Sequence, residues 1–229
     1  MKMRKQFLVG LLILITSSSF LQEGPYVFGQ PSPADGIQTL IVLANQTPHT
    51  LIPSPIRPLL LAKEQEQFLQ ELEGSPPDWT TLHSSDPTKQ SEHLFQLNRL
   101  RDEARLSQGT LLNKPIAFLW AGLLRQYLQE YQGFSVALGP ELTHTSWGII
   151  RFKPMDLPNY LVAIPSPELT TQLQGRQEQG EKIEIGILLM GALIPDESII
   201  YGFSHDGQED GMIMPVVSIQ HILYFLKSS

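Results

Sequence analysis

The chain contains no cysteine. A disulfide framework, an iron–sulfur cluster, a cysteine-bound zinc site and a thiol nucleophile are therefore excluded, because each of them needs sulfur. Stability has to come from the packing of apolar residues, which make up 41% of the sequence.

Charged residues are also scarce, at 17% of the sequence against about 25% in an ordinary soluble domain. The 16 Lys and Arg residues are outnumbered by 23 Asp and Glu residues, which gives a formal net charge of -7. A surface of this sign repels the phosphate backbone of DNA or RNA. The composition therefore disfavours a nucleic acid as the partner.

No apolar run reaches the roughly 20 residues that a helix needs to span a bilayer. The run at residues 7–15 follows Lys2, Arg4 and Lys5 and precedes small polar residues. This pattern is typical of a secretory signal peptide. We expect residues 1–19 to be removed, and cleavage as late as residue 29 fits the pattern equally well. The protein is then periplasmic or secreted and has no membrane span. An uncleaved N-terminal anchor is the alternative.

The rest of the chain divides by composition. Residues 20–36 are rich in glycine and proline and are expected to be a linker. Residues 37–133 form a mainly helical part and residues 134–229 a mainly antiparallel β part, together one continuous globular domain. The predicted fold class is α+β, with an N-terminal helical half packed on a C-terminal antiparallel sheet or small barrel.

Three helices are expected in the first part, at residues 59–73, 86–107 and 115–132, after a short strand at residues 38–44. A second linker is expected at residues 75–85. In the helix at 86–107, one group of apolar side chains is predicted to face the core and a charged group to be solvated. The apolar group is Leu94, Phe95, Leu97, Leu100 and Ala104, and the charged group is Arg99, Arg101, Asp102, Glu103 and Arg105.

The helix at 115–132 is the most apolar and is predicted to be central. Its aromatic residues Trp120, Tyr127 and Tyr131 lie at helical spacing. Such a stripe is usually core, and an aromatic pocket is the alternative.

Short strands separated by turns follow. They are expected at residues 134–138, 147–152, 160–164, 182–194, 198–203, 212–218 and 222–226, with one helix at 167–177. From Phe134 to Phe203 the order strand, strand, strand, helix, strand, strand is similar to that of an oligonucleotide/oligosaccharide-binding barrel. The resemblance is an analogy of topology and implies no activity.

Established catalytic motifs are missing. The sequence has no Walker loop, dinucleotide fingerprint, HExxH or GxSxG motif. We therefore predict no catalytic residue and no cofactor. An enzyme is not excluded, because a pair of carboxylates at a gap set by the fold needs no motif. An exported hydrolase or carbohydrate-active enzyme, using Asp206 or Asp210 with Glu184 or Glu197, is the alternative.

One acidic segment resembles the first half of a calcium-binding loop. Asp206, Gln208 and Asp210 alternate and are followed by Gly211. The twelfth position is Val217, which cannot supply the bidentate carboxylate. A hairpin turn is the preferred interpretation, and a weak cation site is the alternative.

The terminal strand suggests a partner surface. Met212, Met214 and Pro215 lie in it, and proline is confined to edge strands or bulges. An open edge could accept a strand from a partner. The sequence therefore favours an exported, non-catalytic cell-envelope binding or interaction protein whose partner is an unknown envelope protein or a small ligand.

Overall fold

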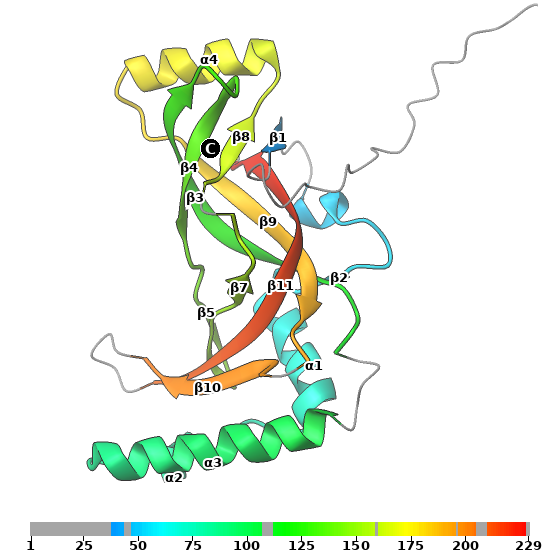
Figure 1. Ribbon diagram of the computed structural model, residues 1–229, viewed down its shortest axis with the longest axis vertical. Helices are drawn as coiled ribbons and strands as arrows, with labels where there is room; N and C mark the ends of the chain where they lie inside the picture. Colours follow the sequence, from blue (N-terminus) through cyan, green and yellow to red (C-terminus); the bar gives the residue numbers. More distant parts are fainter. Residues whose placement is uncertain are drawn as a thin grey trace, which may run out of the picture. The chain divides into compact units, whose positions relative to one another are not determined.

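The computed structural model describes residues 38–43, 47–106, 112–158, 160–195, 197–204 and 210–227. The predicted signal peptide and the linker at 20–36 lie outside these residues. The described part combines helices with a large mixed sheet, so the α+β class is confirmed at that level (Figure 1). The helices are η1 (Pro48–Leu51, a 3-10 helix), α1 (Ala62–Glu73), α2 (Trp79–Leu82), α3 (Pro87–Leu106) and α4 (Pro167–Glu178). The strands are β1 (Gln38–Leu43), β2 (Arg57–Pro58), β3 (Ile116–Leu128), β4 (Gly133–Gly139), β5 (Thr143–Thr145), β6 (Gly148–Ile150), β7 (Lys153–Met155), β8 (Val162–Ile164), β9 (Glu184–Leu193), β10 (Ile199–Phe203) and β11 (Gly211–Leu226).

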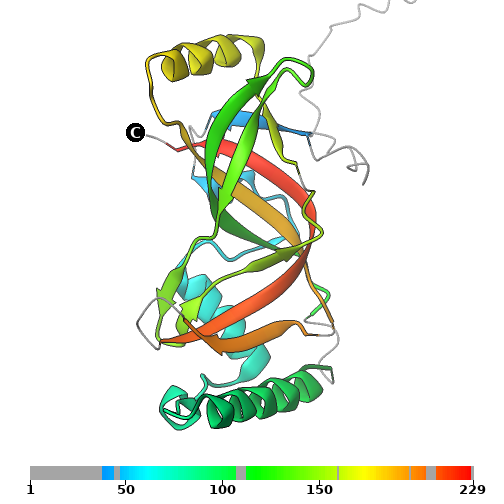
Figure 2. The ribbon, with the colours of Figure 1, turned by 60° about the vertical axis from the view of Figure 1, so that its left-hand side comes forward.

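Six strands pair into a closed ring in the order β1, β8, β4, β3, β9, β11 and back to β1. Figure 2 shows β1 beside the C-terminal end of β11. The pairs that β1 makes with β8 and β11 are parallel, and the other four are antiparallel. The expectation of an antiparallel sheet is therefore corrected to a mixed one.

The order of three strands, a helix and two strands that was compared with the oligonucleotide/oligosaccharide-binding barrel is found along the chain, but it is formed by other segments than expected. After β1, the ring strands and α4 follow one another along the chain in the order β3, β4, β8, α4, β9 and β11. The series therefore starts at β3 rather than at Phe134. Strand β1 is inserted between β8 and β11, so the ring has six strands where that barrel has five.

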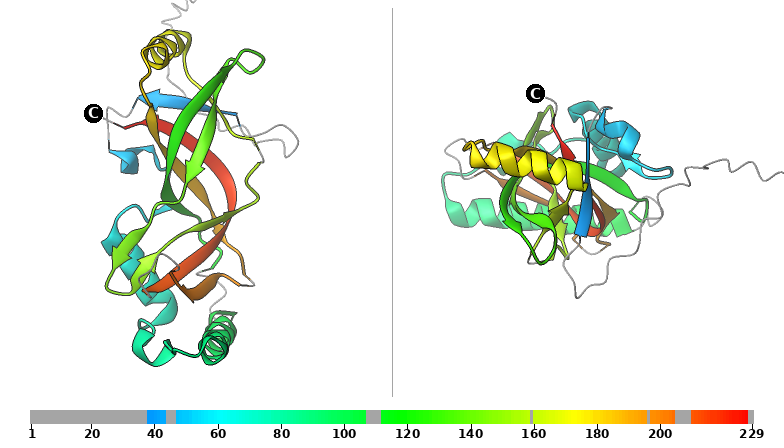
Figure 3. Two further views of the ribbon diagram at one scale, coloured as in Figure 1. Left: turned by 90° about the vertical axis from the view of Figure 1, so that its left-hand side faces the viewer. Right: turned by 90° about the horizontal axis from the view of Figure 1, so that it is seen from above.

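Strand β11 continues beyond the ring into a second group of strands. Its first half pairs with β10 on one side and with β6 and then β7 on the other, and β5 pairs with β6. Helix α4 lies at the far end of the ring, while α1, α2 and α3 lie near β10 (Figure 3). Strand β11 is thus shared by both groups.

The central strand β9 is buried on both faces. Ile185, Ile187 and Leu189 belong to the main core, which extends from the ring strands to α1 and β10. Leu188 and Met190 point the other way and pack with residues of the segment 51–60. Burial on both faces explains why the sequence of β9 is an almost unbroken apolar run.

The prediction of a helix at residues 115–132 is wrong, because most of this segment forms strand β3. Phe118 and Leu124 are buried with the main core, and Ala117 is buried on the opposite face. A strand that is buried on both faces loses the alternation of polar and apolar residues that identifies a strand. Its apolar positions then match helical spacing equally well.

Strand β11 was expected as two strands, at 212–218 and 222–226. It is one strand with a register shift between Ile219 and His221. Val217 and Ile219 belong to the main core before the shift, and Ile222 and Tyr224 belong to it after the shift. One extra residue exchanges the two faces of a strand, so the irregularity keeps apolar side chains inside along the whole strand.

Candidate functional site

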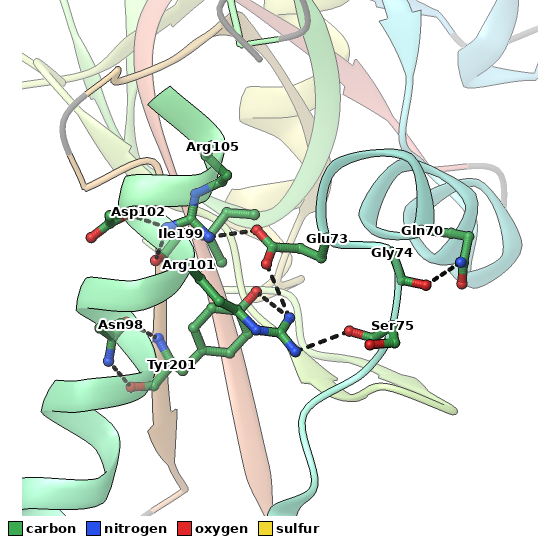
Figure 4. Close-up of polar contacts among 10 residues, drawn as sticks. All are labelled: Gln70, Glu73, Gly74, Ser75, Asn98, Arg101, Asp102, Arg105, Ile199 and Tyr201. Carbon is green, nitrogen blue, oxygen red and sulfur yellow. Dashed lines mark hydrogen bonds and ion pairs between the residues drawn. The ribbon is translucent and has the colours of Figure 1, made fainter. Parts of the chain in front are cut away.

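A cluster of interacting charged side chains joins α1 and α3 to β10 (Figure 4). Glu73 is the last residue of α1, and its carboxylate accepts hydrogen bonds from Arg101 Nη1, at 3.0 Å, and from Arg105 Nη1. The side chains of Glu73 and Arg105 are only 2% and 1% exposed. Arg105 also pairs with Asp102. We call Glu73, Asn98, Arg101, Asp102, Arg105 and Tyr201 the polar junction.

Helical spacing brings the α3 residues of the polar junction together. Asn98, Arg101 and Arg105 are three and four residues apart, so they lie on one side of the helix. Figure 4 shows these three side chains directed from α3 toward Glu73 and β10. They attach α3 to the strand and to the end of α1.

The side chains of α3 also close the outer edge of β10. Asn98 Nδ2 donates to the carbonyl of Tyr201 at 3.1 Å, and the Tyr201 N–H donates to Asn98 Oδ1 at 2.8 Å. Arg105 Nη2 donates to the carbonyl of Ile199 at 3.2 Å. On the other side, the Ser198 carbonyl accepts a hydrogen bond from the Val216 N–H of β11, and the Ser204 N–H donates to the carbonyl of Asp210 just before β11. Helix α3 therefore takes the place that a neighbouring strand would occupy.

Burial and pairing shift the pKa values of two residues of the polar junction, Tyr201 and Arg105. Burial and then the Glu73 carboxylate raise the pKa of Tyr201 well above its usual value. Its hydroxyl accepts a hydrogen bond from Arg101 Nη1 at 3.1 Å. Burial alone would lower the pKa of Arg105, but the charge and hydrogen bond of Glu73 outweigh it and raise the pKa. Tyr201 stays neutral and Arg105 charged, so neither can act as a base near neutral pH.

The opposite side of α3 is exposed. Arg105 is the only buried residue of this 20-residue helix. The large apolar side chains Phe95, Leu100 and Leu106 are 68%, 58% and 55% exposed, although Phe95 and Leu100 were expected to face the core. Leu94 and Leu97 pack against the core only in part. Helix α3 is thus held mainly by polar contacts and presents apolar side chains to solvent.

The prediction that the charged residues of α3 are solvated is wrong for Arg101 and Arg105. Both belong instead to the polar junction. Arg99 and Glu103 are exposed, as expected, and lie 3.9 Å apart. A helix sequence indicates which residues share a side, but the partner Glu73 comes from another helix and has no signal in the sequence of α3.

The calcium-loop residues fall mostly outside the described part. Asp206 and Gln208 are not among the described residues. Asp210 is exposed, and its carbonyl accepts a hydrogen bond from the Ser204 N–H at 2.9 Å. No group of three or more His, Asp or Glu residues is placed to hold a metal ion in the described ranges.

Three carboxylates of the enzymatic alternative are described, and the fold separates them. Glu184 and Glu197 lie toward opposite ends of the ten-residue strand β9, roughly 30 Å apart at about 3.3 Å per residue. Asp210 and Glu197 lie at opposite ends of the β10–β11 pair, roughly 20 Å apart. Glu184 and Asp210 are separated by the length of β11. Catalytic carboxylate pairs lie about 5 to 10 Å apart.

The edge strand expected at Met212, Met214 and Pro215 is not observed. Met212 pairs with Gly202 of β10 on one side and Ile149 of β6 on the other. The register shift of β11 lies between Ile219 and His221, away from Pro215. The N–H of Val216 donates to the carbonyl of Ser198, on the β10 side of β11. Successive residues of a strand direct their backbone groups to opposite sides, so the nitrogen of Pro215 faces away from β10. There it lies opposite the interval between β6 and β7.

The three aromatic residues that the sequence places on one predicted helix differ in burial in the structure. Trp120 and Tyr127 are half-buried and pack against the main core, in agreement with the core interpretation. Tyr131 is exposed, with its ring 6.3 Å from that of Tyr160.

Among the described residues, no helix combines the length and apolar character needed to cross a membrane. No family model matches the chain, and no curated protein or solved structure is significantly similar to it.

Proposed function

We propose that this protein is exported and works as a non-catalytic interaction protein of the cell envelope, with α3 as its contact surface. The export proposal rests on the cationic start and the short apolar run at residues 7–15. The interaction proposal rests on one observation, which is that α3 exposes Phe95, Leu100 and Leu106 while burying only Arg105.

The physical argument concerns what holds α3 in place. A surface helix ordinarily buries an apolar stripe, which supplies most of its stability in the folded protein. Helix α3 packs only Leu94 and Leu97 against the core, and only in part. Its polar attachment comes from the junction residues Asn98, Arg101 and Arg105. Aromatic and large aliphatic side chains held on a fixed element can serve as anchors of a protein-binding surface.

The enzymatic alternative has less support. The pairs formed by Glu184, Glu197 and Asp210 are too widely separated for one catalytic site. Pairs with Asp206 lie outside the described residues. In the polar junction, Glu73 and Asp102 both pair with Arg105, which gives them a structural role.

Site-specific cross-linking tests the contact surface. A photo-reactive amino acid is placed at Phe95 or Leu106, and in the control at exposed Glu178 of α4. The chain is expressed with its N-terminal segment and cross-linked in intact cells. We expect cross-linked products from the α3 positions and none from the control. Equal yields from all three positions would contradict the assignment to α3.

Export is tested on the same material. Intact-mass measurement of the chain from an envelope fraction is expected to show loss of residues 1–19 or a segment up to residue 29. Material that retains Met1 would contradict removal of the N-terminus.

A further inference from the structure

The exposed side of α3 has an ordered pattern of charges. Lys89, Glu92, Gln96, Arg99 and Glu103 are all exposed. Within this set, Gln96 bonds weakly to Glu92 at 3.4 Å, and Arg99 lies 3.9 Å from Glu103. Separations of three, four, three and four residues between them place all five in one stripe along the helix. The stripe alternates in charge and is neutral in sum, although the chain carries -7.

The charges of the stripe are complementary to those of the same stripe in an antiparallel second copy. Lys89 and Glu103 lie seven residues on either side of Gln96, and Glu92 and Arg99 lie four and three residues from it. In two antiparallel copies of α3 related by a two-fold axis at Gln96, Lys89 of each copy faces Glu103 of the other. Glu92 likewise faces Arg99, within about one residue, or 1.5 Å of rise.

We propose that α3 docks against α3 of a second copy of this chain, in an antiparallel arrangement with the two-fold axis at Gln96. This rests on the proposed function, since it names the partner of the same surface. A two-fold contact requires the same patch on both copies, with each pairing occurring twice. The charge pattern of α3 meets that requirement.

A two-fold axis at Gln96 lets the two α3 helices contact each other along nearly their whole length. Helix α3 runs from Pro87 to Leu106, so Gln96 lies at its middle and the two helices overlap over nearly their full length. An axis near either end would leave half of each helix without a partner.

The axis also brings apolar side chains together. Phe95 precedes Gln96 and lies on one flank of the stripe. In an antiparallel pair the same flanks of the two helices face each other, and the two Phe95 positions differ by only about 3 Å along the axis. The 68% exposed side chain of Phe95 is therefore covered by Phe95 of the second copy.

The remainder of the protein leaves this side of α3 accessible within the described residues. Asn98, Arg101 and Arg105 attach the opposite side of the helix to β10 and α1. Figure 1 shows α3 alongside β10, with the strands on one side of the helix only. The polar junction fixes α3 without using the stripe.

Charge reversal tests the pairing. Sedimentation equilibrium of the full chain is expected to show a dimer. Lys89→Glu and Glu103→Lys, made singly, should each weaken it by about tenfold or more, because like charges then face each other twice. The double variant and an equal mixture of the two single variants should both dimerise, because opposite charges again face each other. Glu178→Lys on α4 is the control and should leave the dimer unchanged.

Phe95→Ser should also weaken the dimer. Its urea midpoint should equal that of the wild type when both are measured at concentrations low enough for the chain to be monomeric. A chain that is monomeric at all measured concentrations, or single variants that dimerise as well as the wild type, would overturn the proposal. A monomeric chain that cross-links through Phe95 to another envelope protein overturns self-association and leaves the proposed function standing. A chain that neither dimerises nor cross-links overturns both.

Discussion

Asn98 of α3 exchanges two hydrogen bonds with the backbone of Tyr201 in β10, at 3.1 and 2.8 Å. One amide side chain thus provides both the donor and the acceptor that a neighbouring strand would supply. The outer edge of β10 is closed at this point by a helix, which protects it from pairing with another chain. The stability of the region should depend strongly on this one side chain.

Replacing Asn98 is the first prediction. Asn98→Ala leaves a backbone N–H and a carbonyl of Tyr201 without these partners, which should lower the free energy of unfolding by about 1–3 kcal/mol. Asn98→Asp retains the acceptor but places a carboxylate against the Tyr201 carbonyl, so it should not restore stability. Urea denaturation measures both changes. Gln172→Ala, on the exposed surface of α4, is the control, and an equal loss in that variant would show that the loss does not come from the hydrogen bonds of Asn98.

Glu73 provides the second prediction. Glu73→Gln removes the charge that compensates the buried Arg105, and breaking one side of a buried ion pair costs about 3–5 kcal/mol. Glu71 is a matched control two residues earlier in α1, because it forms a two-pronged ion pair with Arg57 at 2.6 and 3.0 Å but is half exposed. Glu71→Gln should cost less than about 1 kcal/mol. Comparable losses in the two variants would contradict the importance of burial.

The third prediction concerns acid stability. Glu64 lies 2.8 Å from His49 Nε2 and accepts hydrogen bonds from the N–H groups of Leu60 and Leu61 at 2.8 and 3.0 Å. Burial alone would raise the pKa of the Glu64 carboxyl, but these interactions together lower it below the usual 4.5. The ionised carboxyl therefore stabilises the fold above that pH, and its contribution is lost as the pH falls through the folded-state pKa.

Glu64→Gln should accordingly be less stable than the wild type at neutral pH and lose less stability on acidification below about pH 5. Urea midpoints across this range give the comparison. Glu178→Gln, at the exposed end of α4, serves as the control. Parallel pH profiles for wild type and Glu64→Gln would rule out the assigned role of Glu64.

The sequence was sufficient to predict elements whose ends carry local signals. Helix α1 ends before Gly74, and α4 begins at Pro167 after the Ser166 cap, both close to the expected positions. Strand β3 was assigned as a helix because burial on both faces removes the periodicity on which such assignments depend. Polar side chains that meet only in the folded chain, such as Glu73 and Arg105, leave no local pattern. The polar junction therefore could not be predicted, although Asn98, Arg101 and Arg105 do share one side of α3.

The last prediction concerns the contact between α2 and the start of β11. Trp79 donates from Nε1 to the carbonyl of Trp147 at 2.7 Å, and its indole covers Gly211. A Cβ atom at Gly211 would lie 2.0 Å from Trp79 Cδ2, far inside van der Waals contact. Gly211→Ala must therefore displace the indole and its hydrogen bond, and overpacking of this kind costs about 1–3 kcal/mol.

A second glycine gives a control in which the same substitution is expected to raise the stability of the fold. Gly175 lies within α4, and a Cβ atom there meets nothing within 4 Å. Gly175→Ala should stabilise the fold by up to about 1 kcal/mol, because alanine favours the helix. In a Trp79→Ala background the indole is gone, so adding Gly211→Ala should cost much less than it does in the wild type. If the cost of Gly211→Ala is the same in both backgrounds, the strain arises from the backbone of β11 and the indole contact is not its cause.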